Sequence, residues 1–514
     1  MGSNLLSLTF LLPLAGSVLV LLVPRESAGR ACRWVNLIAT FATFVATLAV
    51  WSGWNAARAT LLPGQYALTE DALWIPAFGI RYHLGVDGVS VALLLLTSFV
   101  SIGASMASWK IEKSPKGYHS MFLLLLAGMV GVFMSLDLFL FYLFWEIMLL
   151  PMYFLIGIWG GPRRQYASIK FFLYTLAGSV LMLAGIVLIW IHHRTFQIPE
   201  IVQIAQSAGL FEGKVDGAAT YRLLCFIGFF VAFAIKVPLF PFHTWLPDAH
   251  VEAPTPISMI LAGVLLKMGG YGLIRMAYPF FPSAAVTLEY WIVGLSLASI
   301  VYGAFVAMAQ TDFKKMVAYS SVSHMGFVTL GIASLTPEGS NGAMYMMLAH
   351  GTISSMLFML VGVIYERAHH RDIDRFGGLA WSMPRYGVLS AFAIFASLGL
   401  PGLSGFIAEI TVFLGSFDRF PRLTLVATLG MVVTAAYYLI TLQKVYLGET
   451  PAVYQDKAHY PDTSTRELLI LIPLAVVTLY MGILPGHAME IYRADLEGII
   501  KGVKDVGDAI AKVK

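Results

Sequence analysis

Apolar stretches of about 20 residues recur from one end of this 514-residue sequence to the other, and they constrain its fold more than any other feature. A helix of that length crosses a hydrocarbon core of about 30 Å and satisfies its backbone hydrogen bonds internally, as lipid requires. Charged residues make up only 12% of the chain, against the roughly 25% usual in soluble domains. The sequence therefore predicts an all-α polytopic membrane protein and excludes a water-soluble fold.

The apolar stretches predict about fourteen transmembrane helices. The expected spans are residues 5–23, 35–51, 84–109, 119–135, 136–159, 168–191, 221–245, 255–278, 285–308, 315–334, 341–365, 386–417, 423–446 and 467–489. The first of them lacks a positively charged N-terminal region and a clear cleavage site, so we expect a spanning helix and not a removed signal peptide.

The last residues predict one further helix, of a different kind. After residue 496, apolar side chains recur at steps of three and four, which is typical of an amphipathic helix on the outer surface or on a partner. These side chains are Ile499, Val503, Val506, Ile510 and Val513. A weaker version of the same pattern covers residues 196–211.

Lys and Arg residues are concentrated in alternate loops, such as those holding Lys110 and Arg371, and the positive-inside rule then places both termini on the outer side.

The net charge of +4 is dispersed along the chain, and its distribution does not indicate a nucleic-acid partner. Cys32 and Cys225 are too few to hold an iron–sulfur cluster and match no zinc spacing, so we expect buried free thiols.

Four ionisable residues fall near the middle of predicted spans: Glu146, Lys236, Lys267 and Glu409. A charge there costs roughly 2.5 to 3.5 kcal/mol on insertion scales, so it persists only where it is paired, hydrated or used. A static salt bridge between Glu146 and Lys236 is the structural alternative, but it leaves the other charges unexplained. His324 and His350 lie within two further spans, and histidine exchanges protons near neutral pH.

Three other polar residues have simpler interpretations. His243 and His250 flank a loop after a predicted helix break, and their spacing favours a capping or gating role over a metal site. Asp137 opens the fifth span at its outer end, where it either favours the helix N-terminus or serves proton exit. No phosphate-binding, dinucleotide-binding or nucleophile motif is found, so we expect no cofactor and no metal in this chain.

Two predicted spans are interrupted beside a charge. Pro238 and Pro241 follow Lys236, and Gly399–Gly405 precedes Glu409. Broken helices in corresponding positions indicate inverted repeats with ion sites near mid-membrane. We therefore expect three N-terminal helices in residues 1–118, five-helix repeats in 119–278 and 285–446, and a last helix with the amphipathic tail in 467–514.

The sequence resembles the antiporter-like membrane subunits of respiratory complex I over nearly its whole length. The segments that carry the resemblance are FAIKVPLFPFHTWLPDAHVEAPTP (233–256), LAGVLLKMGGYGLIR (261–275), KKMVAYSSVSHMGFV (314–328), FWEIMLLPMYFLIGIWGG (144–161) and KFFLYTLAGS (170–179). Some branches of the family carry a lysine on the twelfth helix, whereas this sequence has Glu409 and is similar to the glutamate branch.

The resemblance implies a role for each buried ionisable residue. Glu146 and Lys236 match the family's ion pair, Lys267 its central lysine, His324 and His350 its bridging histidines, and Glu409 its terminal proton site. It also implies proton translocation driven by redox chemistry in other subunits, with membrane-arm neighbours on both sides, in a bacterial inner membrane. The alternatives are a subunit of a sodium/proton antiporter or membrane-bound hydrogenase, a passive scaffold, and a substrate transporter.

Overall fold

The computed structural model describes residues 4–61, 64–456 and 460–511. Within these residues, thirteen helices are long and apolar enough to cross a membrane. A fourteenth crossing is formed by α19 (Pro384–Ser397) and α20 (Ser404–Arg419), which a break separates. The prediction of an all-α polytopic fold with about fourteen spans is thus confirmed. The division into repeats stays a prediction.

The helices follow the chain in three groups. The first contains α1 (Leu5–Leu22), α2 (Ala28–Ala57), α3 (Gly88–Ala107), α4 (Pro115–Met134), α5 (Leu138–Ile147), α6 (Leu149–Trp159), α7 (Arg164–His193), α8 (Ile198–Ser207), α9 (Ala218–Lys236) and α10 (Trp245–Glu252). The second is a continuous rod of α11 (Thr255–Ile260), η4 (Leu261–Leu265), α12 (Leu266–Gly272), η5 (Leu273–Ala277) and α13 (Tyr278–Phe280). The third contains, besides α19 and α20, α14 (Pro282–Thr287), α15 (Glu289–Met308), α16 (Phe313–Ala333), α17 (Pro337–Ala368), α18 (Leu379–Ser382), α21 (Pro421–Thr441), η7 (Leu442–Tyr446), α22 (Thr465–Ile483) and α23 (Pro485–Ala511).

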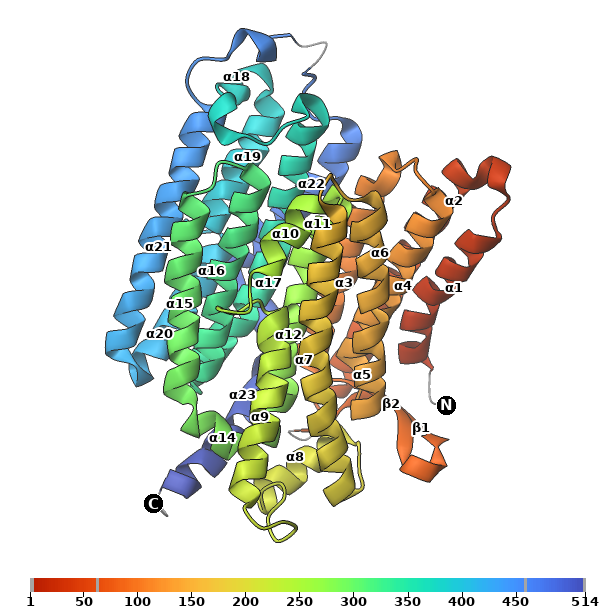
Figure 1. The fold of residues 1–514 in the computed structure, drawn as a ribbon, viewed down its shortest axis with the longest axis vertical. Coiled ribbons are helices and arrows are strands. Elements are labelled where there is room, and N and C mark those ends of the chain that lie inside the picture. The colour runs from red at the N-terminus through yellow and green to blue at the C-terminus, as the bar shows by residue number, and fades with distance from the viewer. Residues whose placement is uncertain (1–3, 62–63, 457–459, 512–514) are drawn as a thin grey trace.

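Three spans form the centre of the bundle. The rod Thr255–Phe280 and α17 are buried along their whole apolar windows, and α16 is 94% buried. By contrast, α1 and α21 are 39% buried, and they lie at opposite edges of the molecule (Figure 1). In a membrane bundle a peripheral span can be apolar all round because lipid surrounds it, whereas a central span can carry polar side chains that face its neighbours. Accordingly, α16 is both among the most buried and the least apolar of the spans. The central spans are therefore where buried charges are most shielded from water.

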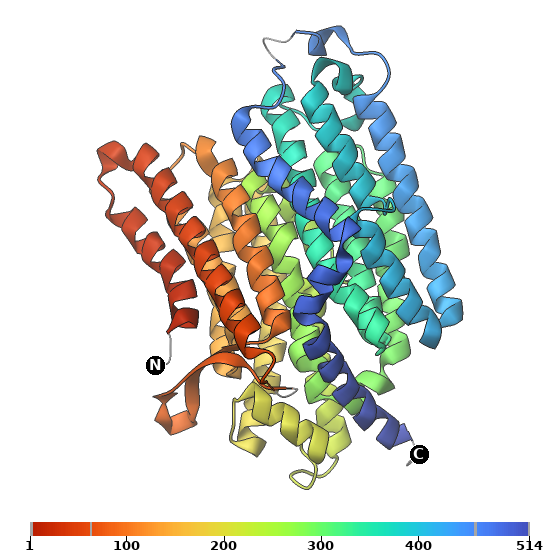
Figure 2. The same ribbon diagram turned by 180° about the vertical axis from the view of Figure 1, so that it is seen from behind.

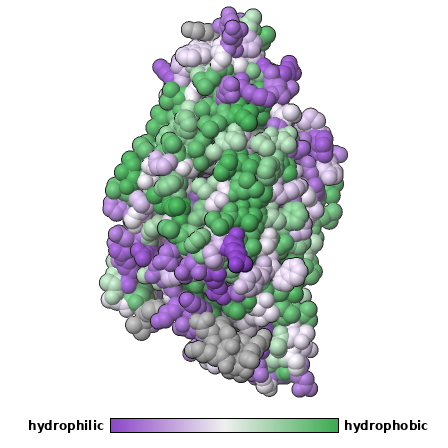
Figure 3. Space-filling view, turned by 90° about the vertical axis from the view of Figure 1, so that its left-hand side faces the viewer, coloured by the Kyte–Doolittle hydropathy of each residue, from purple (hydrophilic) through white to green (hydrophobic). Residues whose placement is uncertain are grey.

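The surface over α15, α20 and α21 is largely apolar (Figure 3). Large exposed side chains on these helices include Trp291, Phe305, Leu414, Phe417, Leu425, Leu429 and Val432. Such an extended apolar face is incompatible with water and is typical of contact with lipid or another membrane protein.

One element was not predicted from the sequence. Strands β1 (Ala67–Ile75) and β2 (Ile80–Val86) form an antiparallel hairpin between α2 and α3. β1 is largely exposed, whereas every residue of β2 is buried or partly buried, so neither strand shows a regular alternation of buried and exposed residues. Glu70 in the hairpin accepts hydrogen bonds from the backbone N–H groups of Leu6 at 2.7 Å and Ser7 at 3.1 Å. The hairpin thereby caps the first turn of α1.

The C-terminal helix also differs from its prediction. The predicted last span runs to residue 489, whereas α22 ends at Ile483 and α23 already begins at Pro485. Figure 2 shows α23 crossing the bundle obliquely, and it packs against α3 and α17 of this same chain. Its buried side chains are Tyr492, Leu496, Ile500 and Val503. Of the predicted stripe, Ile499 and Val506 are partly buried, and Ile510 and Val513 lie outside the described side chains.

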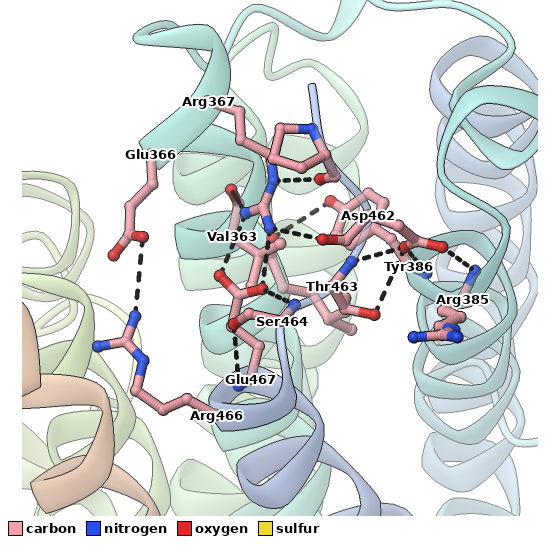
Figure 4. A network of polar contacts seen from close by, with 12 residues as sticks. Val363, Glu366, Arg367, Arg385, Tyr386, Asp462, Thr463, Ser464, Arg466 and Glu467 are labelled. Atoms are coloured by element: carbon pink, nitrogen blue, oxygen red, sulfur yellow. Dashed lines mark hydrogen bonds and ion pairs between the residues drawn. The ribbon is translucent and has the colours of Figure 1, made fainter. Parts of the chain in front are cut away.

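A polar network ties α17, α19 and α22 together at the end of the molecule opposite the two termini (Figure 4). The Arg367 guanidinium donates to Glu467 at 2.9 Å and to the Asp462 carbonyl at 3.2 Å. Asp462 in turn accepts from the backbone N–H of Tyr386, and Ser464 and Glu467 form a capping box at the start of α22. Glu467 is paired with Arg367, and the Asp462 carboxylate accepts backbone hydrogen bonds, so both acids are satisfied, as a structural role requires. Cys32 and Cys225 are free and buried, as predicted.

Candidate functional site

The six predicted site residues lie on six different helices. Glu146 is on α5, Lys236 ends α9, Lys267 is on α12, His324 on α16, His350 on α17 and Glu409 on α20. All except Glu146, which is half-buried, are at most 5% exposed. An isolated buried charge is so costly that the surroundings of each one decide what it can do.

Four of these residues form a continuous chain of contacts. The Lys267 ammonium lies 2.7 Å from Nδ1 of His350. The rings of His350 and His324 are 5.7 Å apart between centroids, and Nε2 of His324 lies 3.8 Å from a carboxylate oxygen of Glu409. Each link joins two groups that can exchange a proton directly or through one water molecule. The structure thus brings together residues that are 142 positions apart in sequence, from Lys267 to Glu409.

His324 is held by two carbonyl oxygens. Its Nδ1 lies 2.8 Å from the carbonyl of Ser320, and its Nε2 lies 3.0 Å from that of Ser397. A neutral imidazole has a single N–H, so only the protonated ring can donate to both carbonyls at once. The nearby Glu409 carboxylate favours that positive charge as well. This site therefore accommodates a proton on the ring.

The six site residues are called the buried row, and no contact of ion-pair length joins its first two members, Glu146 and Lys236, in the part of the chain that the structure describes. The Lys236 ammonium instead lies 5.0 Å from the ring centroid of Trp145 and 5.7 Å from that of Phe171. Oε1 of Glu146 is buried without a hydrogen-bond partner among the described residues. The two charges are neighbours that have not closed into a bridge.

The helix breaks position the charges beside them. α9 ends at Lys236, where Pro238 removes a backbone donor, and the backbone N–H of Phe240 donates to the Ser299 hydroxyl at 2.7 Å. In the second break, Gly399 has a φ of +80°, and a Cβ there would lie 2.5 Å from Oε2 of Glu409. The left-handed backbone favours glycine at this position, and a Cβ would displace the Glu409 carboxylate. That oxygen has no hydrogen-bond partner among the described residues.

The helix that carries Lys267 is not regular, which the sequence did not indicate. Residues 255–278 were predicted as one uniform span, but η4 and η5 are π-helical turns on either side of α12. The Lys267 ammonium donates to the carbonyl of Ala262, within η4. A π turn shifts the backbone hydrogen bonds and frees a carbonyl, so the distortion supplies an acceptor for the buried ammonium.

Three site residues were missed. The Ser397 hydroxyl donates to the Tyr438 hydroxyl at 2.8 Å, which donates to the Ser320 hydroxyl at 3.0 Å. Ser397 and Ser320 are also the residues whose carbonyls hold His324. Small hydroxyl residues are common in membrane helices, and only the folded structure shows that these surround one imidazole.

The remaining polar residues keep their simpler interpretations. His243 and His250 are buried, and none of their ring nitrogens has a hydrogen-bond partner among the described residues. His250 stacks on Phe358 with centroids 4.2 Å apart. No group of three or more His, Cys, Asp or Glu residues in the described chain is placed to hold a metal ion. The capping or gating role of these histidines stays a prediction.

Asp137 caps α5, which confirms one of its two interpretations. Its Oδ1 accepts from the backbone N–H groups of Phe139 and Leu140, and its Oδ2 accepts from Gln197 at 2.7 Å and from the backbone N–H of Arg81. Burial raises the pKa of Asp137 to about 6, although these hydrogen bonds lower it. A carboxylate with all its acceptor sites engaged is suited to holding the helix end.

A bundle of some fourteen spans, with two broken helices and a buried file of lysine, histidine and glutamate, defines an antiporter-like membrane subunit that conducts ions. Comparison with known proteins identifies the family within this class. Residues 135–434 match the family described as NADH:quinone oxidoreductase/Mrp antiporter, TM, and the chain belongs to this family.

Similar relatives cover nearly the whole chain. NADH-quinone oxidoreductase subunit M of Rhodobacter capsulatus is 44% identical over 96% of this chain and 98% of its own length. NADH-ubiquinone oxidoreductase chain 4 of Chondrus crispus is 42% identical over 95% of this chain and 96% of its own. Among solved structures, a chain of respiratory complex I from Thermus thermophilus with bound NADH superposes with a TM-score of 0.85 at 30% identity, covering 97% of this chain and 99% of that one.

Proposed function

We propose that this chain is a proton-translocating membrane subunit of an NADH:quinone oxidoreductase, in which protons move along the buried row from Glu146 to Glu409. The observation that carries the proposal is the contact chain from Lys267 through His350 and His324 to Glu409. The similar relatives are named as subunits of quinone oxidoreductases, which supports this assignment over the antiporter and hydrogenase alternatives.

The proposed mechanism uses the charge of Glu146 as a switch. When the Glu146 carboxylate approaches Lys236, their attraction holds the ammonium proton. When the carboxylate withdraws, as in the open arrangement here, the desolvated lysine between Trp145 and Phe171 favours its neutral form and gives up the proton. The proton then passes through Lys267 to His350.

The second half of the row stores and delivers the proton. His324 accepts it because two carbonyl oxygens and Glu409 stabilise the imidazolium. Glu409 is the terminal acceptor, and its unpaired Oε2 is free to receive the proton. Moving one charge against 100 mV costs about 2.3 kcal/mol, which a change of one to two pKa units at paired sites can match.

In this proposal the driving reaction belongs to other subunits, because Cys32 and Cys225 are too few to hold an iron–sulfur cluster and the sequence has no dinucleotide-binding motif. Its neighbours are the other membrane-arm subunits, in a bacterial inner membrane with both termini on the outer side. The two termini lie toward the same end of the bundle (Figure 1), and the end opposite them carries Lys110, Arg367 and Arg466. Enrichment of cations at the cytoplasmic ends of spans supports this orientation.

The test replaces Lys267 in the assembled complex. Lys267→Met removes the central link while matching its length and its apolar surroundings, and Lys267→Arg keeps a positive charge that cannot be given up. We expect both variants to assemble and to lose at least about half of the protons moved per NADH oxidised in vesicles, since a direct proton-transfer group contributes roughly 10² to 10⁴ in rate. Normal translocation in Lys267→Met would refute the proposed function. Stimulation by sodium at constant pH would favour the antiporter alternative.

A further inference from the structure

A second cluster of buried charges lies at the end of the molecule where both termini are found. Arg275 in η5 is 3% exposed, and its Nη2 lies 2.6 Å from both carboxylate oxygens of Asp87. Its Nη1 donates to the Tyr66 hydroxyl at 3.1 Å. Asp87 is 4% exposed and also caps α3 through the backbone N–H of Ser90. The proposed row from Glu146 to Glu409 uses none of these groups.

The C-terminal helix adds a second carboxylate to this cluster. Oδ2 of Asp495 on α23 accepts from the backbone N–H of Gly88 at 2.6 Å, one residue after Asp87. A Cβ at position 88 would lie 1.8 Å from the carbonyl oxygen of Ile491 and 2.9 Å from Oδ2 of Asp495. Glycine therefore lets α23 cross directly over the start of α3. With two ionised carboxylates and one guanidinium, the three groups Asp87, Asp495 and Arg275 carry a net charge of −1. Binding one proton to a carboxylate would make this cluster neutral.

Polar groups lie between the cluster and the central row. Lys267, Tyr271 and Arg275 follow one another at four-residue steps on the same buried rod, and the Lys267 ammonium itself contacts Ala262 and His350. The Arg275 guanidinium lies 5.4 Å from the ring centroid of Tyr271. The Tyr271 hydroxyl lies 3.4 Å from that of Ser90, within the first turn of α3 that Asp87 caps, and 3.3 Å from the Phe133 carbonyl. Tyr271 is therefore the polar side chain between Lys267 and Arg275 on this rod.

The cluster opens on its far side to a cavity of 760 Å³. The cavity wall includes Asp87, Arg275 and Asp495, so solvent reaches the carboxylates from the molecular surface. Polar groups from every neighbouring element line this cavity around Asp495. The charged ones are Asp87 before α3, Arg275 from the rod, and Lys501 and Asp505 from α23. The uncharged ones are Gln65 and Tyr66 before the hairpin and Gln203 and Gln206 from α8. Burial, and then the charge of Asp87, raises the pKa of Asp495 to about 6, although Gly88 and Arg275 oppose this.

We propose that Asp87, Arg275 and Asp495 form a further proton-binding site, which receives protons from Lys267 through Tyr271 and releases them into this cavity. The inference rests on the proposed function of the buried row. It assigns to this subunit its own release route beside α23, separate from the terminal Glu409. Arg275 is a positioning residue in this site, because it stays charged and fixes Asp87, while the shared proton resides on the carboxylate pair.

The test is Asp495→Asn in the assembled complex, with protons moved per NADH oxidised measured in vesicles between about pH 5 and pH 7.5, a range that brackets the pKa. Asparagine keeps an oxygen for the Gly88 N–H but cannot titrate. A release site empties above its pKa and stays loaded below it. The wild-type complex should therefore translocate less as the pH on the cavity side falls below about 6. We expect Asp495→Asn to lower translocation at least about twofold at pH 7 and to abolish this dependence.

Glu490→Gln is the matched control, since it removes a carboxylate charge from an exposed position of the same helix that does not line the cavity, and it should match the wild type. Asp495→Glu should restore most of the activity and the pH dependence. A wild-type profile in Asp495→Asn overturns the inference. Should that variant fail to assemble, Tyr271→Phe decides, because it removes only the Tyr271 hydroxyl, and normal translocation there overturns the inference as well. Loss of translocation in Lys267→Met alongside normal Asp495→Asn leaves the proposed function standing and refutes only this release route.

Discussion

His324 is the residue on which the second half of the row depends. Both of its nitrogens lie within hydrogen-bonding distance of backbone carbonyls, and Glu409 lies 3.8 Å from Nε2. Backbone acceptors cannot titrate or rotate away, so they fix the orientation of the protonated ring. A ring fixed in this way can pass a proton to Glu409 without first breaking a side-chain contact of its own.

At Glu409, we expect removal of the carboxylate to stop delivery without harming the fold. Glu409→Ala should assemble, because the break at residues 398–403 is formed by backbone and glycine, and should lower the number of protons moved per electron at least about twofold. Glu409→Gln, which keeps the shape but cannot titrate, should fail equally, and Glu409→Asp should retain part of the activity. Proton uptake by vesicles during NADH oxidation is the measurement. An unchanged proton-to-electron ratio in Glu409→Ala would exclude Glu409 as the terminal site.

Variants of Glu146 and Lys236 distinguish a switching role of this pair from a purely structural one. If the pair were only structural, Lys236→Met alone would leave Glu146 unpaired and destabilise the fold by several kcal/mol, and adding Glu146→Gln would restore assembly and activity. For a switch, the double variant assembles but still fails to pump, which is the result we expect because the open geometry shows no bridge to lose. Glu146→Asp should keep partial activity, since it preserves the charge and shortens the side chain by one methylene. Proton uptake per turnover, with blotting for assembled complex, distinguishes these outcomes.

Among the elements, the sequence predicted those that depend on local properties of the chain. The apolar stretches located the spans, because the length of an apolar segment determines whether it can cross the bilayer. Pro238 and Gly399 located the two breaks, because such residues interrupt a helix at their own position. Packing decided the rest. The local sequence around Lys267 contains nothing that distinguishes π turns from a regular α-helix. The position of α23 depends on how Gly88 fits against Ile491, two residues that are far apart in the sequence. The same holds for Tyr438, whose role appears only where α16, α19 and α21 meet.

The second break offers a test that separates backbone strain from carboxylate placement. Gly399 and Gly402 both have positive φ values, of +80° and +92°. A methyl group at position 399 would meet Oε2 of Glu409 at 2.5 Å, whereas nothing lies within 4 Å of one at position 402. Both alanine variants should lose roughly 1 to 2 kcal/mol through the left-handed backbone. We expect only Gly399→Ala to lose proton translocation as well, because it displaces the carboxylate. Equal translocation in both variants, measured in vesicles at matched levels of assembled complex, would contradict the proposed importance of this contact.

At the scale of the whole molecule, the buried row runs across the bundle from α5 to α20, and α20 packs against α21, which lies at one edge (Figure 1). A row that ends at an edge can act on a neighbour there, and the face over α20 and α21 is apolar enough to pack against one (Figure 3). We therefore infer that this face contacts another membrane subunit, and that the chain does not pump alone. A purified, monodisperse monomer that moves protons in liposomes would contradict this.

A bulky substitution distinguishes a neighbouring subunit from lipid at this face. Val432 on α21 is 66% exposed and Val180 on α7 is 51% exposed, and both are β-branched residues in the middle of a span. Fluid lipid accommodates a larger side chain, whereas a packed interface does not, and overpacking typically costs about 1 to 3 kcal/mol. Val432→Trp should therefore weaken co-purification of the complex in mild detergent, while Val180→Trp on α7, a helix at the front of the bundle in Figure 1, should leave it intact. Intact complex from both variants would place lipid at α21, and the row from Glu146 to Glu409 would then have to deliver its protons without a partner at that edge.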